Sequence, residues 1–190
     1  LVLTNALIGA ADRGVRIRFL IDDLFTSATD QTLLLLSQHP NIEVRLFNPV
    51  SRRGSYSLNF VGSFSKANRR MHNKSFTVDN AISVVGGRNI GDEYFELGDD
   101  SVFADFDVLA LGEIAKAISN SFDVYWNHEM AIPIEQLSSQ SDAESLEAER
   151  SRLKEEAQAT YAGIYEEAMS SELLQNLITG DQPLFVANAL

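Results

Sequence analysis

The N-terminal part of the chain alternates between segments with helical periodicity and short apolar runs of strand length. Apolar positions recur at helical spacing over 4–13, which predicts a helix that ends at Gly14, and again over 30–38. The runs at 15–21 and 42–47 are rich in Val, Ile, Leu and Phe and predict two buried strands. Strand, helix and strand in succession predict a parallel pair joined by a crossover.

The middle of the chain predicts a hairpin. Segments 74–79 and 81–85 have strand character and are separated at Asp79-Asn80, a dipeptide suited to a tight turn. The stretch 49–68 before them is long, contains Gly and Ser, and is interpreted as a loop near the functional site. Asp79 is therefore expected at the end of a strand.

Two further helical segments follow. Over 111–126 the apolar residues line one face, and we interpret Phe122 and Trp126 as core residues rather than ligand contacts. Beyond residue 134 a polar stretch precedes a charged helix with a narrow apolar stripe. We expect this helical extension, 135–190, to bridge two halves of a longer protein or to mediate an interaction, and its acidity argues against lying on an anionic membrane.

Composition allows a folded domain with its own core. The chain has 190 residues, of which 45% are hydrophobic, and no cysteine, so disulfides are excluded. No apolar run approaches the ~18 residues needed to span a bilayer. Together with the alternation of helices and strands, this predicts an α/β domain with a mixed β-sheet flanked by helices.

Charge is distributed unevenly along the chain. The net charge is −12, yet 44–78 contains no acidic residue and seven Lys or Arg, so the other residues together carry −19. A basic segment is therefore expected on an acidic body. A nucleic-acid enzyme more usually has a broad basic face, so this distribution argues against nucleic acid as a partner.

One motif lies at the end of the basic segment. It runs His72-x-Lys74-x4-Asp79 and continues, after six residues, as Gly-Gly87-x-Asn89. Alternate residues of an extended strand share a face, so the imidazole and the ammonium would meet one ligand. An imidazole can attack phosphorus, and a lysine offsets charge on phosphoryl oxygens, so that ligand should carry a phosphate. An isolated His-x-Lys would be weak evidence for such a site, but the full pattern is long and therefore more specific.

This pattern resembles the HKD signature of the phospholipase D superfamily, in its bacterial cardiolipin synthase-like branch. The likeness extends from about residue 3 to about residue 126. It implies one phospholipase D-like half, with His72 as the nucleophile that forms a phosphohistidine and Lys74 beside it. The family commonly has serine where this chain has Gly87, which leaves the backbone N–H as the donor at that position.

The resemblance also implies supporting roles. Asp79 would hold the geometry of the motif, form the turn, or do both, and we favour a structural contribution to the site over direct proton transfer. Asp105 would accept a hydrogen bond from the imidazole, with Asp107 as the alternative. Asp22 and Asp23 could be a metal pair, but loop and cap roles are the stronger interpretation, and no metal or cofactor is expected. The predicted catalytic residues are His72, Lys74, Asp79 and Asp105, and the predicted phosphate contacts are Gly87, Asn89, Arg69 and Arg70.

Members of the family normally use two motifs, and this chain has one. His39 and His128 lack a lysine two residues on and cannot supply the second. Either two chains pair, as in small one-motif nucleases, or the chain is a piece of a two-motif protein. The two ends of the sequence favour the second alternative, a piece of a two-motif protein. Residues 1–134 would be a first half lacking its opening strand, and 135–190 would lead towards a second half.

The resemblance implies a phosphatidyltransferase. The substrate would be a phospholipid such as phosphatidylglycerol, and the acceptor a lipid headgroup hydroxyl; if the acceptor were water, the same site would be a phospholipase. A homodimeric phosphodiesterase or nuclease and a noncatalytic interaction module are the alternatives. We expect a bacterial protein that meets the membrane surface in its full-length form, with this part soluble.

Overall fold

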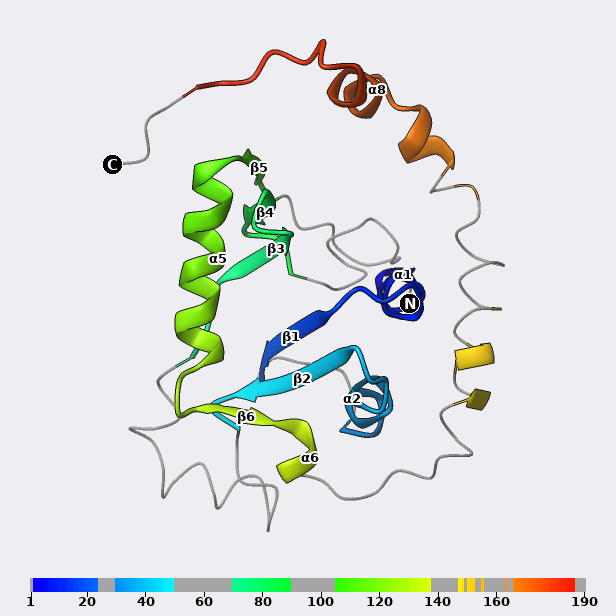
Figure 1. Ribbon diagram of the computed structural model, residues 1–190, viewed down its shortest axis with the longest axis vertical. Coiled ribbons are helices and arrows are strands. Elements are labelled where there is room, and N and C mark those ends of the chain that lie inside the picture. The colour runs from blue at the N-terminus through cyan, green and yellow to red at the C-terminus, as the bar shows by residue number, and fades with distance from the viewer. Residues whose placement is uncertain are drawn as a thin grey trace.

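The computed structural model has the predicted α/β composition. Its strands form two three-stranded sheets, with helices packed around them (Figure 1). The expected class, an α/β fold with β-structure flanked by helices, is confirmed, although the described strands form two sheets and the prediction was one mixed sheet. The structure describes residues 2–23, 30–49, 70–89, 105–137, 147–148, 150–152, 155, 163 and 166–186.

The first sheet contains the predicted parallel pair. Strand β1 (Ile17–Asp22) lies beside β2 (Ile42–Phe47), in a register that pairs Ile17 with Ile42. The short strand β6 (Ala131–Pro133) adds to the other side of β2 in the antiparallel sense, which makes this sheet mixed. The two predicted strands and their relative direction are therefore confirmed.

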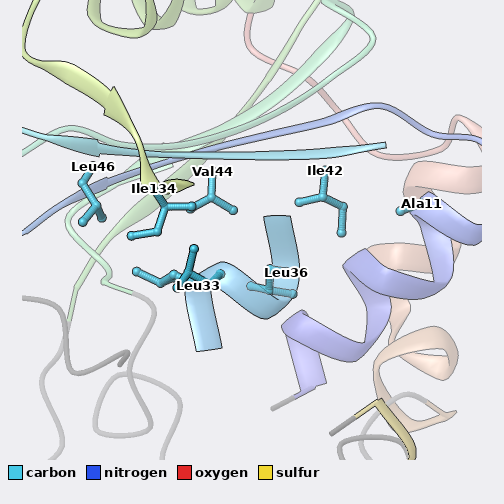
Figure 2. Close-up of a cluster of buried hydrophobic side chains, with 8 residues drawn as sticks. Ala11, Leu33, Leu36, Ile42, Val44, Leu46 and Ile134 are labelled. Atoms are coloured by element: carbon cyan, nitrogen blue, oxygen red, sulfur yellow. The ribbon is translucent and has the colours of Figure 1, made fainter. Parts of the chain in front are cut away.

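Alternation along the strands decides which side of this sheet is the core. Helices α1 (Val2–Asp12) and α2 (Asp30–Ser37) and the short α6 (Ile134–Leu137) pack beside it. Every second side chain of β2 points towards them (Figure 2). Full burial of each such aliphatic side chain stabilises the fold by about 1.5–3 kcal/mol. The labelled members of this cluster are Ala11, Leu33, Leu36, Ile42, Val44, Leu46 and Ile134.

The second sheet is antiparallel and carries the motif. Its strands are β3 (Lys74–Val78), β4 (Ile82–Gly86) and β5 (Asp107–Leu111), in that order. Residues 79–81 connect β3 to β4 by a turn that the Ala81 N–H closes on the Val78 carbonyl oxygen at 3.0 Å, and its central residues Asp79 and Asn80 have φ of 51° and 55°. Positive φ at both central positions is the geometry of a type I′ hairpin, so the predicted turn is confirmed.

Helix α5 (Glu113–Trp126) packs across all three strands of the second sheet. Its buried Ser119 donates a hydrogen bond from Oγ to Oδ1 of Asn80 in the hairpin turn. The helix also reaches the first sheet, because the Arg45 guanidinium lies 4.3 Å from the Trp126 ring centroid and donates to its carbonyl oxygen at 2.8 Å. Trp126 is buried as predicted, and α5 connects the two sheets.

The C-terminal extension is helical where it is described. Residues 147–148, 150–152 and 166–170 are helical, and α8 (Glu172–Thr179) follows them at the periphery (Figure 1). Ser171 caps its first turn by accepting a hydrogen bond from the Leu174 backbone N–H, and Gly180 ends it at φ 82°. Among the described residues, no helix is both long and apolar enough to cross a membrane.

Candidate active site

The two central residues of the motif lie in contact. His72 belongs to the extended segment before β3, and Lys74 is the first residue of that strand. The Lys74 Nζ atom lies 3.2 Å from His72 Nδ1 and donates to the His72 carbonyl oxygen at 2.9 Å. Because an ammonium can only donate, Nδ1 is the acceptor, and the proton of the neutral ring is on Nε2.

His72 and Lys74 line a cavity of about 340 Å³ that lies between the second sheet, α5 and β1. Polar groups of the motif segment form one part of its wall, and aliphatic and aromatic side chains form the rest. An anionic group and an adjoining apolar group could therefore be held together. The lining residues outside the motif segment include Leu20, Val85, Ile118, Ser121, Phe122 and Tyr125.

Helix α5 contributes a wall of this cavity, which was not predicted from the sequence. Ile118, Ser121, Phe122 and Tyr125 follow the i, i+3, i+4, i+7 spacing of one helical face. That spacing was available as a signal, but we interpreted this face as core. For Phe122 the interpretation was incomplete: its ring stacks on Trp126 with centroids 5.6 Å apart, and it also lines the cavity.

Asp79 lies at the other end of β3 from Lys74. It is exposed, and its positive φ makes it a residue of the hairpin turn. The cavity-lining part of the motif segment ends at Ser75. Of the two roles considered for Asp79, this placement favours the formation of the turn, and its contribution to the site stays a prediction.

Gly86, the last residue of β4, and Gly87 after it allow β5 to approach closely. A β-carbon on Gly86 would lie 2.5 Å from the Phe106 carbonyl oxygen, and one on Gly87 would lie 2.9 Å from Asp105 Cγ. The Gly87 N–H donates to the Phe106 carbonyl oxygen at 3.3 Å. Gly86 lines the cavity, so the glycines also bring β5 close to the site.

The two candidate carboxylates lie in different surroundings. Asp107 forms an ion pair with Arg88, with 2.9 Å between Oδ2 and Nε, whereas the Asp105 carboxylate lies against Gly87. The predicted hydrogen bond from His72 to Asp105 stays a prediction. Asn89 is exposed beyond the glycines, and its phosphate contact likewise stays a prediction.

Arg70 lies beside the site rather than in its lining. Its guanidinium pairs with Asp22 at 3.0 Å and is 13% exposed. Arg69 lies outside the described residues. Among the residues that the structure describes, no group of three or more His, Cys, Asp or Glu is placed to hold a metal ion.

A family model described as the phospholipase D-like domain of cardiolipin synthase matches residues 2–126. The chain belongs to this family. The matched residues include strands β1 to β5 and helix α5, and therefore the motif and the residues that line the cavity. The resemblance inferred from the motif is confirmed.

Individual relatives agree with the family. Over 136 residues the chain is 49% identical to cardiolipin synthase C of Escherichia coli K12, a match that covers 72% of this chain and 29% of that protein. An uncharacterised protein of Helicobacter pylori J99 is 32% identical over 192 residues, covering 100% of this chain and 38% of that protein. A cardiolipin synthase of Geobacillus sp. WCH70 is 32% identical over 127 residues, covering 65% and 23%. The chain thus spans well under half the length of these relatives.

Proposed function

We propose that this chain forms one half of a phosphatidyltransferase site of the cardiolipin synthase kind. The observation that carries the proposal is the contact between His72 and Lys74 at the wall of a cavity that is otherwise largely apolar. A phospholipid combines a phosphodiester with apolar groups, and this cavity offers partners for both. The names of the Escherichia coli and Geobacillus relatives support the same reaction class.

The first step would be attack on phosphorus by an imidazole nitrogen of His72. The new bond is P–N, and the bond that breaks is P–O to the departing alcohol, which leaves with the electron pair. Phosphate oxygens would draw the Lys74 ammonium away from Nδ1, so the ring proton could move there from Nε2 and free Nε2 to attack. Lys74 would then offset charge on the equatorial oxygens, as donors do in phosphoryl transfer.

The second step would be attack on phosphorus by the oxygen of an acceptor alcohol. The P–N bond breaks, His72 is regenerated, and the acceptor proton leaves to a base. If the acceptor is the headgroup hydroxyl of phosphatidylglycerol, the product is cardiolipin; if it is water, the site is a phospholipase. No cofactor takes part in this scheme.

A second motif would supply the proton for the departing alcohol. General acid catalysis of this kind is typically worth ~10²–10⁴ in rate. We propose that it comes from a second half of a longer protein, with a homodimer partner as the alternative. In that longer protein the site would work at a bacterial membrane surface, where its substrate resides, and nucleic acid is not a proposed partner.

The experiment uses bis(p-nitrophenyl) phosphate, because p-nitrophenolate leaves without a general acid. We expect the isolated 190-residue chain to be essentially inactive in turnover: it should release one equivalent of p-nitrophenol, retain an acid-labile phosphohistidine and then stop. His72→Ala should release none, and Lys74→Ala should slow the burst by several orders of magnitude. His128→Ala is the matched control, since its imidazole lies beside Phe47 and not in the cavity.

Each alternative predicts a different result. Turnover that rises with the dimer population would favour the homodimeric phosphodiesterase. A burst that persists in His72→Ala would contradict the assignment of the nucleophile. No burst from the unmodified chain, despite normal folding, would favour the noncatalytic interaction module. Vesicles of phosphatidylglycerol with the complete protein then test transfer against hydrolysis.

A further inference from the structure

Asp22, the last residue of β1, is joined to the segment that carries the motif. Its Oδ2 accepts a hydrogen bond from the Met71 backbone N–H at 2.8 Å, and its Oδ1 lies 3.0 Å from Arg70 Nη1. One carboxylate thus contacts two consecutive residues directly before His72. A charge-assisted hydrogen bond to a backbone amide is short and directional, so it fixes the main chain there.

The pair of Asp22 and Arg70 is largely removed from solvent. The exposed fractions of the two side chains are 8% and 13%. Arg70 also donates from Nη2 to the carbonyl oxygen of Asn48 at 3.2 Å, and the Asn48 N–H donates to the Met130 carbonyl oxygen at 2.8 Å. The contact therefore joins the carboxyl ends of β1 and β2 to the segment that precedes β3.

These contacts lie beside the cavity. Met71 and Leu20 both line it, and Leu20 shares a face of β1 with Asp22 because alternate residues of a strand point the same way. The carboxyl ends of parallel strands are where α/β folds commonly bind ligands. Asp22 is thus placed to set the position of His72 relative to the wall made by β1.

We propose that Asp22 is a positioning residue that holds His72 and Lys74 at the cavity through the Met71 amide and the Arg70 guanidinium. This proposal rests on the proposed function of His72. It also gives Arg70 a role different from the predicted phosphate contact: the guanidinium neutralises Asp22 and orders the chain before the nucleophile. Asp22 itself touches neither phosphate nor the reacting atoms.

The two roles of Arg70 predict effects of opposite sign. If Arg70 binds phosphate directly, removing the Asp22 charge releases the guanidinium from this ion pair, and affinity for phosphate should increase. If Asp22 positions the motif, the same substitution should weaken affinity, because His72 and Lys74 lose their common orientation. Inorganic phosphate is a suitable probe, and its affinity can be followed through the backbone amide shifts of residues 71–75.

The test compares Asp22→Asn with Asp123→Asn in the 190-residue chain. Asp123 also pairs with an arginine, Arg18, at 2.6 Å, but its side chain is 44% exposed and neither residue lines the cavity. We expect Asp22→Asn to weaken phosphate binding on the order of tenfold and to change the ring-nitrogen shifts of His72. Asp123→Asn should change neither, whatever it does to the melting temperature.

A second variant, Arg70→Gln, keeps the proposal testable if Asp22→Asn does not fold. Arg70→Gln keeps the hydrogen bond from Met71 to Asp22 and should weaken phosphate binding less than Asp22→Asn does. Unchanged or tighter phosphate binding in Asp22→Asn overturns the positioning role. If Asp22→Asn does not fold, the positioning role is overturned when Arg70→Gln loses as much phosphate binding as Lys74→Ala does. If His72→Ala and Lys74→Ala leave phosphate binding intact, the proposed function fails instead.

Discussion

The carboxylate of Asp105 fills the space in which a side chain at Gly87 would begin. A β-carbon at that position would lie 2.9 Å from Asp105 Cγ, closer than real β-carbons come to other atoms. The family that the motif resembles commonly has serine at this position. In this chain, Gly87 leaves that space empty and the side chain of Asp105 fills it.

Substitution of the two glycines should have unequal effects. At Gly86 the obstacle is backbone, with the Phe106 carbonyl oxygen at 2.5 Å and Asp107 Cα at 2.8 Å. Gly86→Ala should therefore lower the free energy of unfolding by about 1–3 kcal/mol, as overpacking does. Gly87→Ala should have a smaller effect, because the Asp105 side chain can rotate away. Urea denaturation measures both.

The same pair provides a control. In an Asp105→Ala background the obstacle at residue 87 is gone, so Gly87→Ala should cost less there than in the unmodified chain. Gly86→Ala should keep its full effect in that background. Equal effects of Gly87→Ala in both backgrounds would show that the carboxylate does not exclude a side chain.

The two candidate carboxylates should separate stability from activity. Asp107→Asn weakens a partly exposed ion pair with Arg88 and should lower stability by at most about 1 kcal/mol. Asp105→Asn should leave stability nearly unchanged and reduce the p-nitrophenol burst, because an amide cannot stabilise a cationic imidazole as a carboxylate does. The reverse pattern would identify Asp107 as the partner of His72.

Asp79 should respond to substitution as a turn residue. Its φ of 51° strains a β-branched side chain, so Asp79→Val should destabilise the hairpin by about 1–2 kcal/mol. Asp79→Asn should be tolerated in both stability and burst amplitude, since asparagine adopts the left-handed region readily. A burst lost in Asp79→Asn at unchanged melting temperature would instead support a direct role at the site.

Local patterns predicted most of the secondary structure. Strand 42–47 was predicted with its observed bounds, and the turn at Asp79 and Asn80 was predicted from residue type alone. Such elements follow from alternation and turn chemistry, which are local. The helix predicted over 111–126 begins at Glu113, because Gly112 takes a positive φ of 75°.

Apart from the parallel pairing of β1 and β2, the relations between distant segments were not predicted. Asp22 was interpreted as a loop or cap residue, because nothing in the sequence indicates that its carboxylate meets residues 70 and 71. The apolar face of α5 was interpreted as core, since periodicity does not distinguish a side chain that packs on a neighbour from one that lines a cavity. The division of strands between two sheets likewise depends on tertiary packing.

The last prediction concerns pH and the contact of Asp12, at the end of α1, with His39 and Arg150. The His39 Nε2 atom lies 3.1 Å from Asp12 Oδ1, and the Asn41 N–H donates to His39 Nδ1 at 3.1 Å, so Nε2 carries a proton and donates. This hydrogen bond, followed by that from Arg150, holds the pKa of Asp12 below its usual value of 3.8. The contact connects α1 to the turn after α2 and to the C-terminal extension.

A lowered carboxyl pKa fixes the sign of the pH effect. The stabilisation is fully present above pH 3.8 and is lost as pH falls through the lower pKa of the folded state. Asp12→Asn should therefore be less stable than the unmodified chain at neutral pH, and the difference should narrow below pH 3.8. Glu147→Gln is the control, because Glu147 lies 3.9 Å from Arg150 and is 82% exposed, so its removal should matter little. A difference between Asp12→Asn and the unmodified chain that widens in acid would contradict this assignment.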